Sequence, residues 1–179
     1  HGSATDKLRT FYYQGRIYQN GADSEKAMNC FVNALESSVS SDDHITIARC
    51  FYSQGTIYQH MYDWKKVIES NINASEYFKF SNNVNSQFRS LLRAINGYSQ
   101  LYDTNKASEI ILQANTLLPQ VSFANKGFYY ATCISFYSDN EMIEELRSML
   151  SEYINNVPKE RIDWISVAYA YTILNDYEM

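Results

Sequence analysis

The feature that most constrains the fold of this chain is an internal repeat with a period of 40 residues. The segments 9–19 and 49–59 are identical at eight of their eleven positions. A third, weaker copy begins at Arg89, a fourth near Lys126 and a fifth near Arg161. Self-similarity at a period of about 20 to 50 residues is typical of proteins that stack one supersecondary unit on the next. We therefore expect an array of units without a single centre.

Each copy contains two stretches with the periodicity of a helix, separated by a short polar break. The predicted first helices span about 5–20, 43–60, 83–102, 122–137 and 159–174, and the predicted second helices about 24–38, 63–80, 104–117 and 140–155. Asp23, Asp63, Asp103 and Asp139 are the expected N-caps of the second helices. The 6 Gly and 2 Pro are too few for the tight turns of an all-β fold. The pattern predicts an all-α protein of about nine helices.

The small and aromatic residues of the copies resemble the tetratricopeptide repeat family. The residues that carry the resemblance are Phe11, Gly15, Tyr18, Ala27, Phe31 and Ala34 in the first copy, Phe51, Gly55, Tyr58 and Ala74 in the second, Tyr98, Ala107, Ala114 and Pro119 in the third, and Trp164, Ala168 and Tyr171 in the fifth. The period of 40 is longer than the family's usual period of about 34, and Gln14 and Gln54 stand where the family has Leu.

The resemblance implies a right-handed α-solenoid of stacked antiparallel helix pairs. Its units would span about 5–41, 42–82, 83–121, 122–157 and a truncated 158–179. In the family, first helices line a concave groove that binds extended peptides. By the same resemblance, residues 4–179 are expected to form one domain.

The two ends of the sequence are expected to differ from those of the natural protein. Residues 1–3 look like the remnant of a purification tag. The fifth unit stops before its second helix, so the sequence is expected to be a fragment of a longer protein. The apolar residues Trp164, Val167 and Tyr171 would then need cover, and self-association through the last helix is one hypothesis.

A row of cationic and polar residues recurs on one face of the first helices, because its members are spaced by three and four positions. The candidate binding residues are Arg9, Tyr12, Arg16, Gln19, Arg49, Tyr52, Thr56, Gln59, Arg89, Arg93, Asn96, Lys126 and Tyr129. Arg pairs well with carboxylates, Tyr offers a flat apolar wall, and Gln and Asn can bond a peptide backbone. Such a face would suit an acidic peptide or a C-terminal carboxylate. Alternatively, each Arg pairs with a nearby acid such as Glu36, Asp42, Asp43 or Glu76.

Several other classes of function find no support in the residues. The net charge of -5 weakens the case for nucleic-acid binding, and no apolar run is long enough for membrane insertion. Metal-ligand spacings, nucleophile elbows and phosphate loops are not found, so no catalytic residue, metal or cofactor is predicted. Cys30, Cys50 and Cys133 are interpreted as small buried hydrophobes.

The expected function is therefore a non-catalytic protein- or peptide-binding scaffold that uses a concave groove. The alternative is the ligand- or peptide-sensing half of a larger signalling or transcriptional regulator whose output domain lies beyond Met179. A helix-turn-helix or a membrane helix after that residue would favour the regulator. The sequence leaves the compartment unknown: the cytoplasm is slightly favoured, and the cell envelope stays open because the natural N-terminus is expected to be missing.

Overall fold

The protein is all-helical in the computed structural model, which describes residues 3–176. Within that range there are nine α-helices and no strand. The helices are α1 (Ala4–Asn20), α2 (Ser24–Glu36), α3 (His44–His60), α4 (Trp64–Phe80), α5 (Val84–Gln100), α6 (Thr104–Leu117), α7 (Phe123–Asp139), α8 (Ile143–Asn156) and α9 (Trp164–Asp176). Short 3₁₀ turns at Leu118–Gln120 and Lys159–Arg161 lead into α7 and α9. The predicted all-α class is confirmed, and so is the expected number of helices within the described residues.

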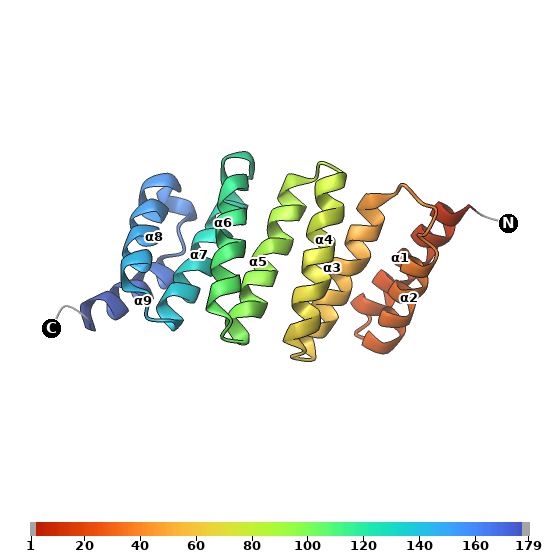
Figure 1. Ribbon diagram of the computed structural model, residues 1–179, viewed down its shortest axis with the longest axis horizontal. Helices are drawn as coiled ribbons and strands as arrows, with labels where there is room; N and C mark the ends of the chain where they lie inside the picture. Colours follow the sequence, from red (N-terminus) through yellow and green to blue (C-terminus); the bar gives the residue numbers. More distant parts are fainter. Residues whose placement is uncertain (1–2, 177–179) are drawn as a thin grey trace.

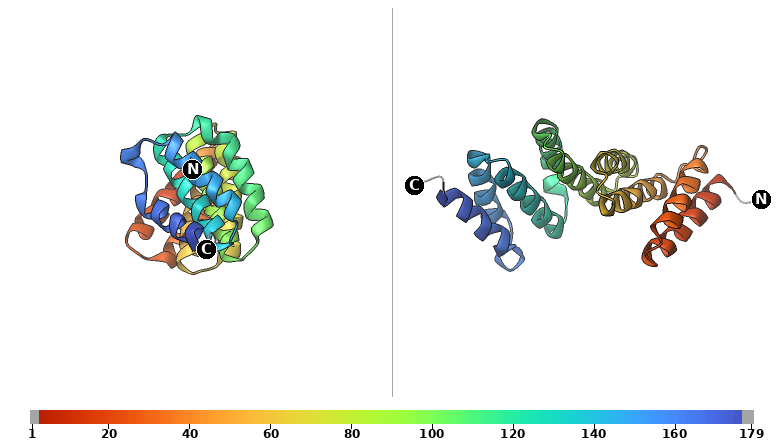
Figure 2. Two further views of the ribbon diagram at one scale, coloured as in Figure 1. Left: turned by 90° about the vertical axis from the view of Figure 1, so that its left-hand side faces the viewer. Right: turned by 90° about the horizontal axis from the view of Figure 1, so that it is seen from below.

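The helices are arranged as adjacent pairs in a row, with α1 and α9 at opposite ends (Figures 1 and 2). Each of the pairs α1–α2, α3–α4, α5–α6 and α7–α8 packs along its length, and α4 packs against α5 as closely as against α3. First helices also meet: α1 contacts α3, α5 contacts α7, and α7 contacts α9. In contrast, α3 and α5 have few close backbone contacts, so their facing side chains decide what fills the space between them.

Turns of one type connect the tightly packed neighbours. In the described part of the chain, five three-residue turns each place a residue with positive φ at the second position, namely Ala22, Tyr62, Asn82, Tyr102 and Glu141. The amide of the third residue donates to the carbonyl five residues back, which satisfies the end of the first helix. In four of the five turns that third residue is an Asp or Asn whose side chain caps the next helix.

Asp23, Asp63 and Asp103 are confirmed as N-caps of the second helices. The prediction that Asp139 is an N-cap is wrong. Asp139 is the last residue of α7, and α8 begins four residues later with Met142 at its N-cap. The start of α9 is also later than predicted. Pro158 and the 3₁₀ turn after it delay the helix to Trp164, where Asp163 accepts a hydrogen bond from the amide of Ile165.

A lysine that the sequence analysis did not single out completes three of these turns. The carboxylates of Asp23, Asp63 and Asp103 lie 2.9, 3.3 and 3.4 Å from the ammonium groups of Lys26, Lys66 and Lys106. Each ammonium also lies over a tyrosine ring at the end of the preceding helix, with 5.6, 5.1 and 5.8 Å between Nζ and the centroids of Tyr18, Tyr58 and Tyr98. The same two contacts, one ion pair and one cation–π contact, therefore recur between the two helices of each of the first three units.

The core repeats with the period of the sequence. Three buried positions of the second helices hold Ala27, Val67 and Ala107, then Phe31, Asn71 and Ile111, then Ala34, Ala74 and Ala114. Glycines stand where helices approach closely: a Cβ on Gly15 would fall 2.6 Å from the ring of Phe31, and one on Gly97 would fall 2.6 Å from Cγ1 of Ile68. Gly15 thus lets α1 approach its own partner α2, whereas Gly97 lets α5 approach α4 of the preceding unit.

Two expectations concern the ends of the chain. The suggested tag residues His1 and Gly2, and residues 177–179, lie outside the described residues. Of the three apolar residues expected to need cover, Val167 is already buried against the core. Trp164 and Tyr171 stay about half exposed, which leaves self-association a hypothesis.

We expect Gly97→Ala to lower the free energy of unfolding by about 1 to 3 kcal/mol, because the added methyl overlaps a stiff, buried, β-branched side chain. Urea unfolding of Gly97→Ala, Ile68→Ala and the double variant measures this. The cost of the added methyl should shrink in the Ile68→Ala background, where Cγ1 is gone. An equal cost in both backgrounds would contradict the close approach.

We expect Ala22→Gly to raise the free energy of unfolding by roughly 0.5 to 1 kcal/mol, since alanine at a φ of 60° is strained and glycine is not. Thermal and urea unfolding measure the effect. The matched control is Ala168→Gly, at an exposed position inside α9, which should cost about 1 kcal/mol instead. Shifts of the same sign in both variants would rule out the strained turn.

Candidate functional site

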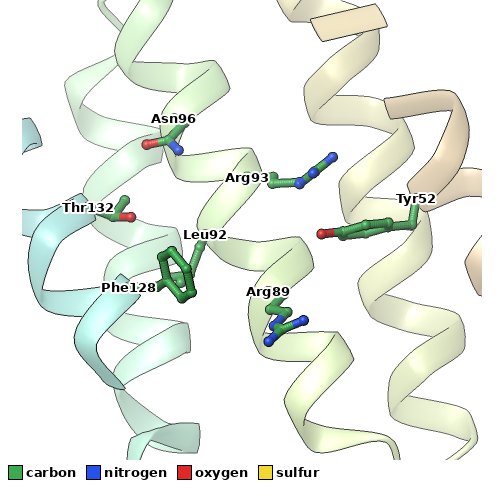
Figure 3. Close-up of a pocket in the computed structure, with 7 residues that line it drawn as sticks. All are labelled: Tyr52, Arg89, Leu92, Arg93, Asn96, Phe128 and Thr132. Atoms are coloured by element: carbon green, nitrogen blue, oxygen red, sulfur yellow. The ribbon is translucent and has the colours of Figure 1, made fainter. Parts of the chain in front are cut away.

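Two adjoining cavities open on the face of the first helices that the sequence singled out. The larger, of about 340 Å³, is lined by Tyr52 from α3, by Arg89, Leu92, Arg93 and Asn96 from α5, and by Phe128 and Thr132 from α7 (Figure 3). The smaller, of about 180 Å³, is lined by Tyr12, Arg16, Arg49, Tyr52, Phe78, Ser86 and Arg89. Tyr52 and Arg89 line both cavities, so the two form one continuous surface, called here the basic groove.

The basic groove brings together seven of the predicted binding residues from α1, α3 and α5: Tyr12, Arg16, Arg49, Tyr52, Arg89, Arg93 and Asn96. Their spacing explains why, since residues three and four apart on a helix share a face. Tyr12 is only 5% exposed and its ring packs against Phe31, so it lies where the basic groove meets the core, whereas Cys50 and Leu91 are fully buried.

Arg93 closes the space between α3 and α5. Its guanidinium carbon lies 4.3 Å from the centroid of the Tyr52 ring, and its Nη1 donates a 2.6 Å hydrogen bond to Oγ1 of Thr56. Figure 3 shows Arg93 and Tyr52 pointing toward each other across this gap. Both contacts cross between helices that barely touch through their backbones, so they hold Arg93 in place before any ligand arrives. Thr56 is thereby used inside the protein.

Arg89 connects α5 to the start of α7. Its Nε donates a 2.7 Å hydrogen bond to Oδ1 of Asn125, whose own Nδ2 donates to Oδ1 of Asn85 at 2.7 Å. Asn125 is buried, so the bond is shielded from water. The contact uses one of the five N–H donors of the guanidinium.

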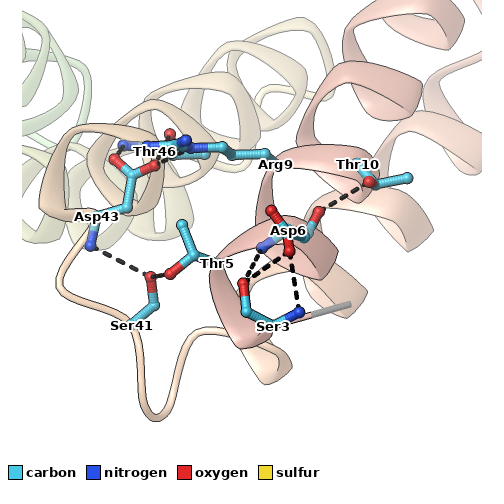
Figure 4. Close-up of polar contacts among 8 residues, drawn as sticks. All are labelled: Ser3, Thr5, Asp6, Arg9, Thr10, Ser41, Asp43 and Thr46. Atoms are coloured by element: carbon cyan, nitrogen blue, oxygen red, sulfur yellow. Dashed lines mark hydrogen bonds and ion pairs between the residues drawn. The ribbon is translucent and has the colours of Figure 1, made fainter. Parts of the chain in front are cut away.

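Arg9 pairs with a nearby acid, which was the alternative to ligand binding for these arginines. Its Nε lies 2.6 Å from Oδ2 of Asp43, the residue that caps α3, and it lines neither cavity (Figure 4). Burial alone would raise the pKa of Asp43, but the hydrogen bonds from Arg9 and Thr46 outweigh it and hold this pKa below its ordinary value. The same pair raises the pKa of Arg9. Arg9 therefore joins α1 to α3.

The four arginines of the basic groove, Arg16, Arg49, Arg89 and Arg93, have no ion pair with a carboxylate among residues 3–176. Neither cavity is lined by an acidic side chain. Arg16 donates a 3.2 Å hydrogen bond to the hydroxyl of Tyr12, and Arg49 is exposed. The basic groove is therefore a positive region on a chain whose net charge is -5.

The remaining predicted residues of the first three units lie outside the two cavities. Gln19 is partly buried and donates a 3.4 Å hydrogen bond to the carbonyl of Ser53, which links α1 to α3. Gln59 is exposed near the end of α3. Both share the predicted face, but neither contributes to the basic groove.

In the fourth unit, neither of the predicted residues Lys126 and Tyr129 lines the basic groove. Tyr129 is 1% exposed, its ring packs against those of Phe88 and Tyr130, and burial raises its pKa. Lys126 is partly buried, with its ammonium 5.3 Å from the centroid of the Phe123 ring.

The spacing of the turns shows which residue of α7 corresponds to the arginines of the earlier units. The positive-φ residues Tyr62 and Tyr102 are 40 residues apart, but Glu141 follows after 39. Phe128, which is 39 residues after Arg89, therefore takes the position that arginine holds in the first three units. Sequence reasoning missed Phe128 and Thr132, and the one-residue shift of the turn was the signal that could have found them.

A comparison with protein-family models finds no match for the chain, and neither does a comparison with curated proteins or with solved structures. Within residues 3–176, no group of three or more His, Cys, Asp or Glu side chains could hold a metal ion, and no helix is long and apolar enough to cross a bilayer. All three cysteines are free, and burial raises the pKa of Cys50 and of Cys133 to about 12.

We expect Arg9→Gln to destabilise the protein at neutral pH and to have little effect near pH 2. The lowered pKa of Asp43 means that its contribution to stability is present above its unfolded value of 3.8 and is lost as pH falls through the folded value. Urea unfolding from pH 2 to 7 measures the difference between variant and wild type. Lys7→Gln, at an exposed position of the same helix, is the control and should show no such pH dependence.

Proposed function

We propose that this protein is a non-catalytic binding module that holds an extended, acidic segment of a partner protein along its first helices. The observation that carries the proposal is the set of four arginines without carboxylate partners, drawn from three helices, around two adjoining cavities. An unpaired guanidinium on a net-negative chain is most favourably met by an anion from outside.

The other groups of the basic groove fit a peptide. The ring of Tyr52 and the side chain of Leu92 give the larger cavity apolar walls, and the exposed amide of Asn96 can both donate to and accept from a peptide backbone. A carboxylate can take two parallel N–H bonds from one arginine. Carboxylates spaced along an extended segment could thus meet arginines on successive helices.

Preorganisation supports the same conclusion. Arg93 is already fixed by Tyr52 and Thr56, and Arg89 by Asn125, so binding would order few further side chains.

We further propose that the row of helix pairs is a right-handed solenoid of antiparallel pairs, similar to tetratricopeptide repeats, with the basic groove on its concave side. The repeated helix pairs, and the glycines at their close approaches, support this architecture.

We expect Arg49→Ala to weaken binding of an acidic peptide about tenfold while leaving thermal stability unchanged, because Arg49 is exposed and makes no ion pair among the described residues. The probe is a fluorescein-labelled peptide of five consecutive glutamates flanked by glycines, titrated by fluorescence anisotropy at low and high salt. Lys65→Ala removes the same charge from an exposed position of α4 and should change the affinity little. Equal affinities of both variants at both salt concentrations would refute the proposal.

A further inference from the structure

A third cavity continues the line of the basic groove at the far side of α7. It has a volume of about 420 Å³ and is lined mainly by apolar groups, including Phe123, Ala124, Gly127, Phe128 and Ala131. Phe128 lines both this cavity and the larger cavity of the basic groove. The two are therefore neighbours that share one aromatic wall.

The chemical character changes in steps along this line. The cavity between α1, α3 and α5 has Arg16, Arg49 and Arg89, and the next has Arg89 and Arg93. The third has one cation, Arg161, together with one acid. That acid, Asp163, already accepts hydrogen bonds from Ser166 and from the amide of Ile165 at the start of α9.

The third cavity has room for an apolar side chain. Phe128 is 62% exposed and Phe123 is 49% exposed, so two aromatic rings present unfilled apolar surface. Gly127 has no side chain to fill the floor, and a Cβ placed there would meet only the carbonyl of Arg161 at 3.8 Å and the hydroxyl of Tyr153 at 3.9 Å. Burial of a large apolar side chain against these groups would be favourable.

On the basis of the proposed function, we infer that the ligand has two parts: a run of several carboxylates, and one large apolar side chain about three residues away from it. The helices α5 and α7 are in contact, packed helices are typically about 8 to 10 Å apart, and an extended chain covers roughly 3.3 Å per residue, which sets this spacing.

The arginines also indicate that the carboxylates belong to side chains within the ligand. They come from α1, α3 and α5 and are divided between two cavities, so no single carboxylate can meet all of them. A run of acidic side chains can, because it places one carboxylate after another along the basic groove. A blocked C-terminus should therefore not weaken binding.

The test compares acetylated, amidated and labelled peptides on the wild-type protein. The plain peptide carries five glutamates alone. The other peptides add a phenylalanine either three or eight residues away from the glutamates, and each is made with the phenylalanine before and after them. In at least one order, the peptide with the three-residue spacing should bind at least tenfold more tightly than the plain peptide. The peptide with the eight-residue spacing should gain less than threefold in affinity.

Two variants show where the phenylalanine binds. For each variant, the gain is the affinity for the peptide with phenylalanine three residues away divided by the affinity for the plain peptide. Phe128→Ala removes the shared wall, and Ala124→Glu puts a charge at an exposed position of the third cavity. Both should reduce the gain below threefold. Ala168→Glu, at an exposed position of α9 that lines none of the three cavities, is the matched control and should preserve it.

Failure of this inference differs from failure of the proposed function. If the plain peptide binds through Arg49 but phenylalanine adds nothing, or adds the same in Phe128→Ala and Ala124→Glu, the two-part ligand is wrong and the acidic-segment proposal stands. A requirement for a free C-terminus would also overturn the two-part ligand. If the plain peptide binds with neither an amidated nor a free C-terminus, or if a fifteen-residue oligothymidine binds more tightly and displaces it, both are wrong.

Discussion

The close approach of neighbouring helices is the constraint on which the rest of this structure depends. At Gly15, Gly55 and Gly97, a single added carbon would fall 2.6 Å from an atom of the facing helix. One helix pair cannot bury its apolar side alone, so the units stack, and the glycines set how closely they do so. Once the small and apolar side of each first helix is packed, the opposite side is fixed as a shared surface. The row of arginines and tyrosines is that surface.

Within residues 3–176, the positive charges of the basic groove are not balanced by carboxylates beside them. The chain has 20 acidic residues and 15 Lys and Arg, so carboxylates are not scarce. Where a cation serves the fold, an acid stands beside it, as Asp43 does for Arg9 and Asp23 does for Lys26. The arginines of the basic groove lack such partners within the described residues. They are held instead by neutral groups, such as Thr56 and Asn125, which position a guanidinium and leave its charge uncompensated.

A small irregularity in the repeat changes the chemistry along the row. The step from the turn at Tyr102 to the turn at Glu141 is 39 residues instead of 40, and Phe128 stands where the earlier units have arginine. Lys126 and Tyr129, which the sequence alignment of the units had placed on this surface, are partly and fully buried, respectively. The array thus passes from a cationic end to an apolar end.

The sequence by itself determined the helices, their pairing in units and the face on which Arg49, Tyr52 and Arg89 lie, because a helix repeats every 3.6 residues and a stacked unit must keep its small residues in register. It also determined the caps at Asp23, Asp63 and Asp103, whose side chains act within one turn. Only the tertiary structure decided that Arg9 pairs with Asp43, that Arg93 reaches across to Thr56, and that Phe128 replaces an arginine. Those outcomes depend on distances between residues 34 to 39 positions apart, which spacing within one helix does not fix.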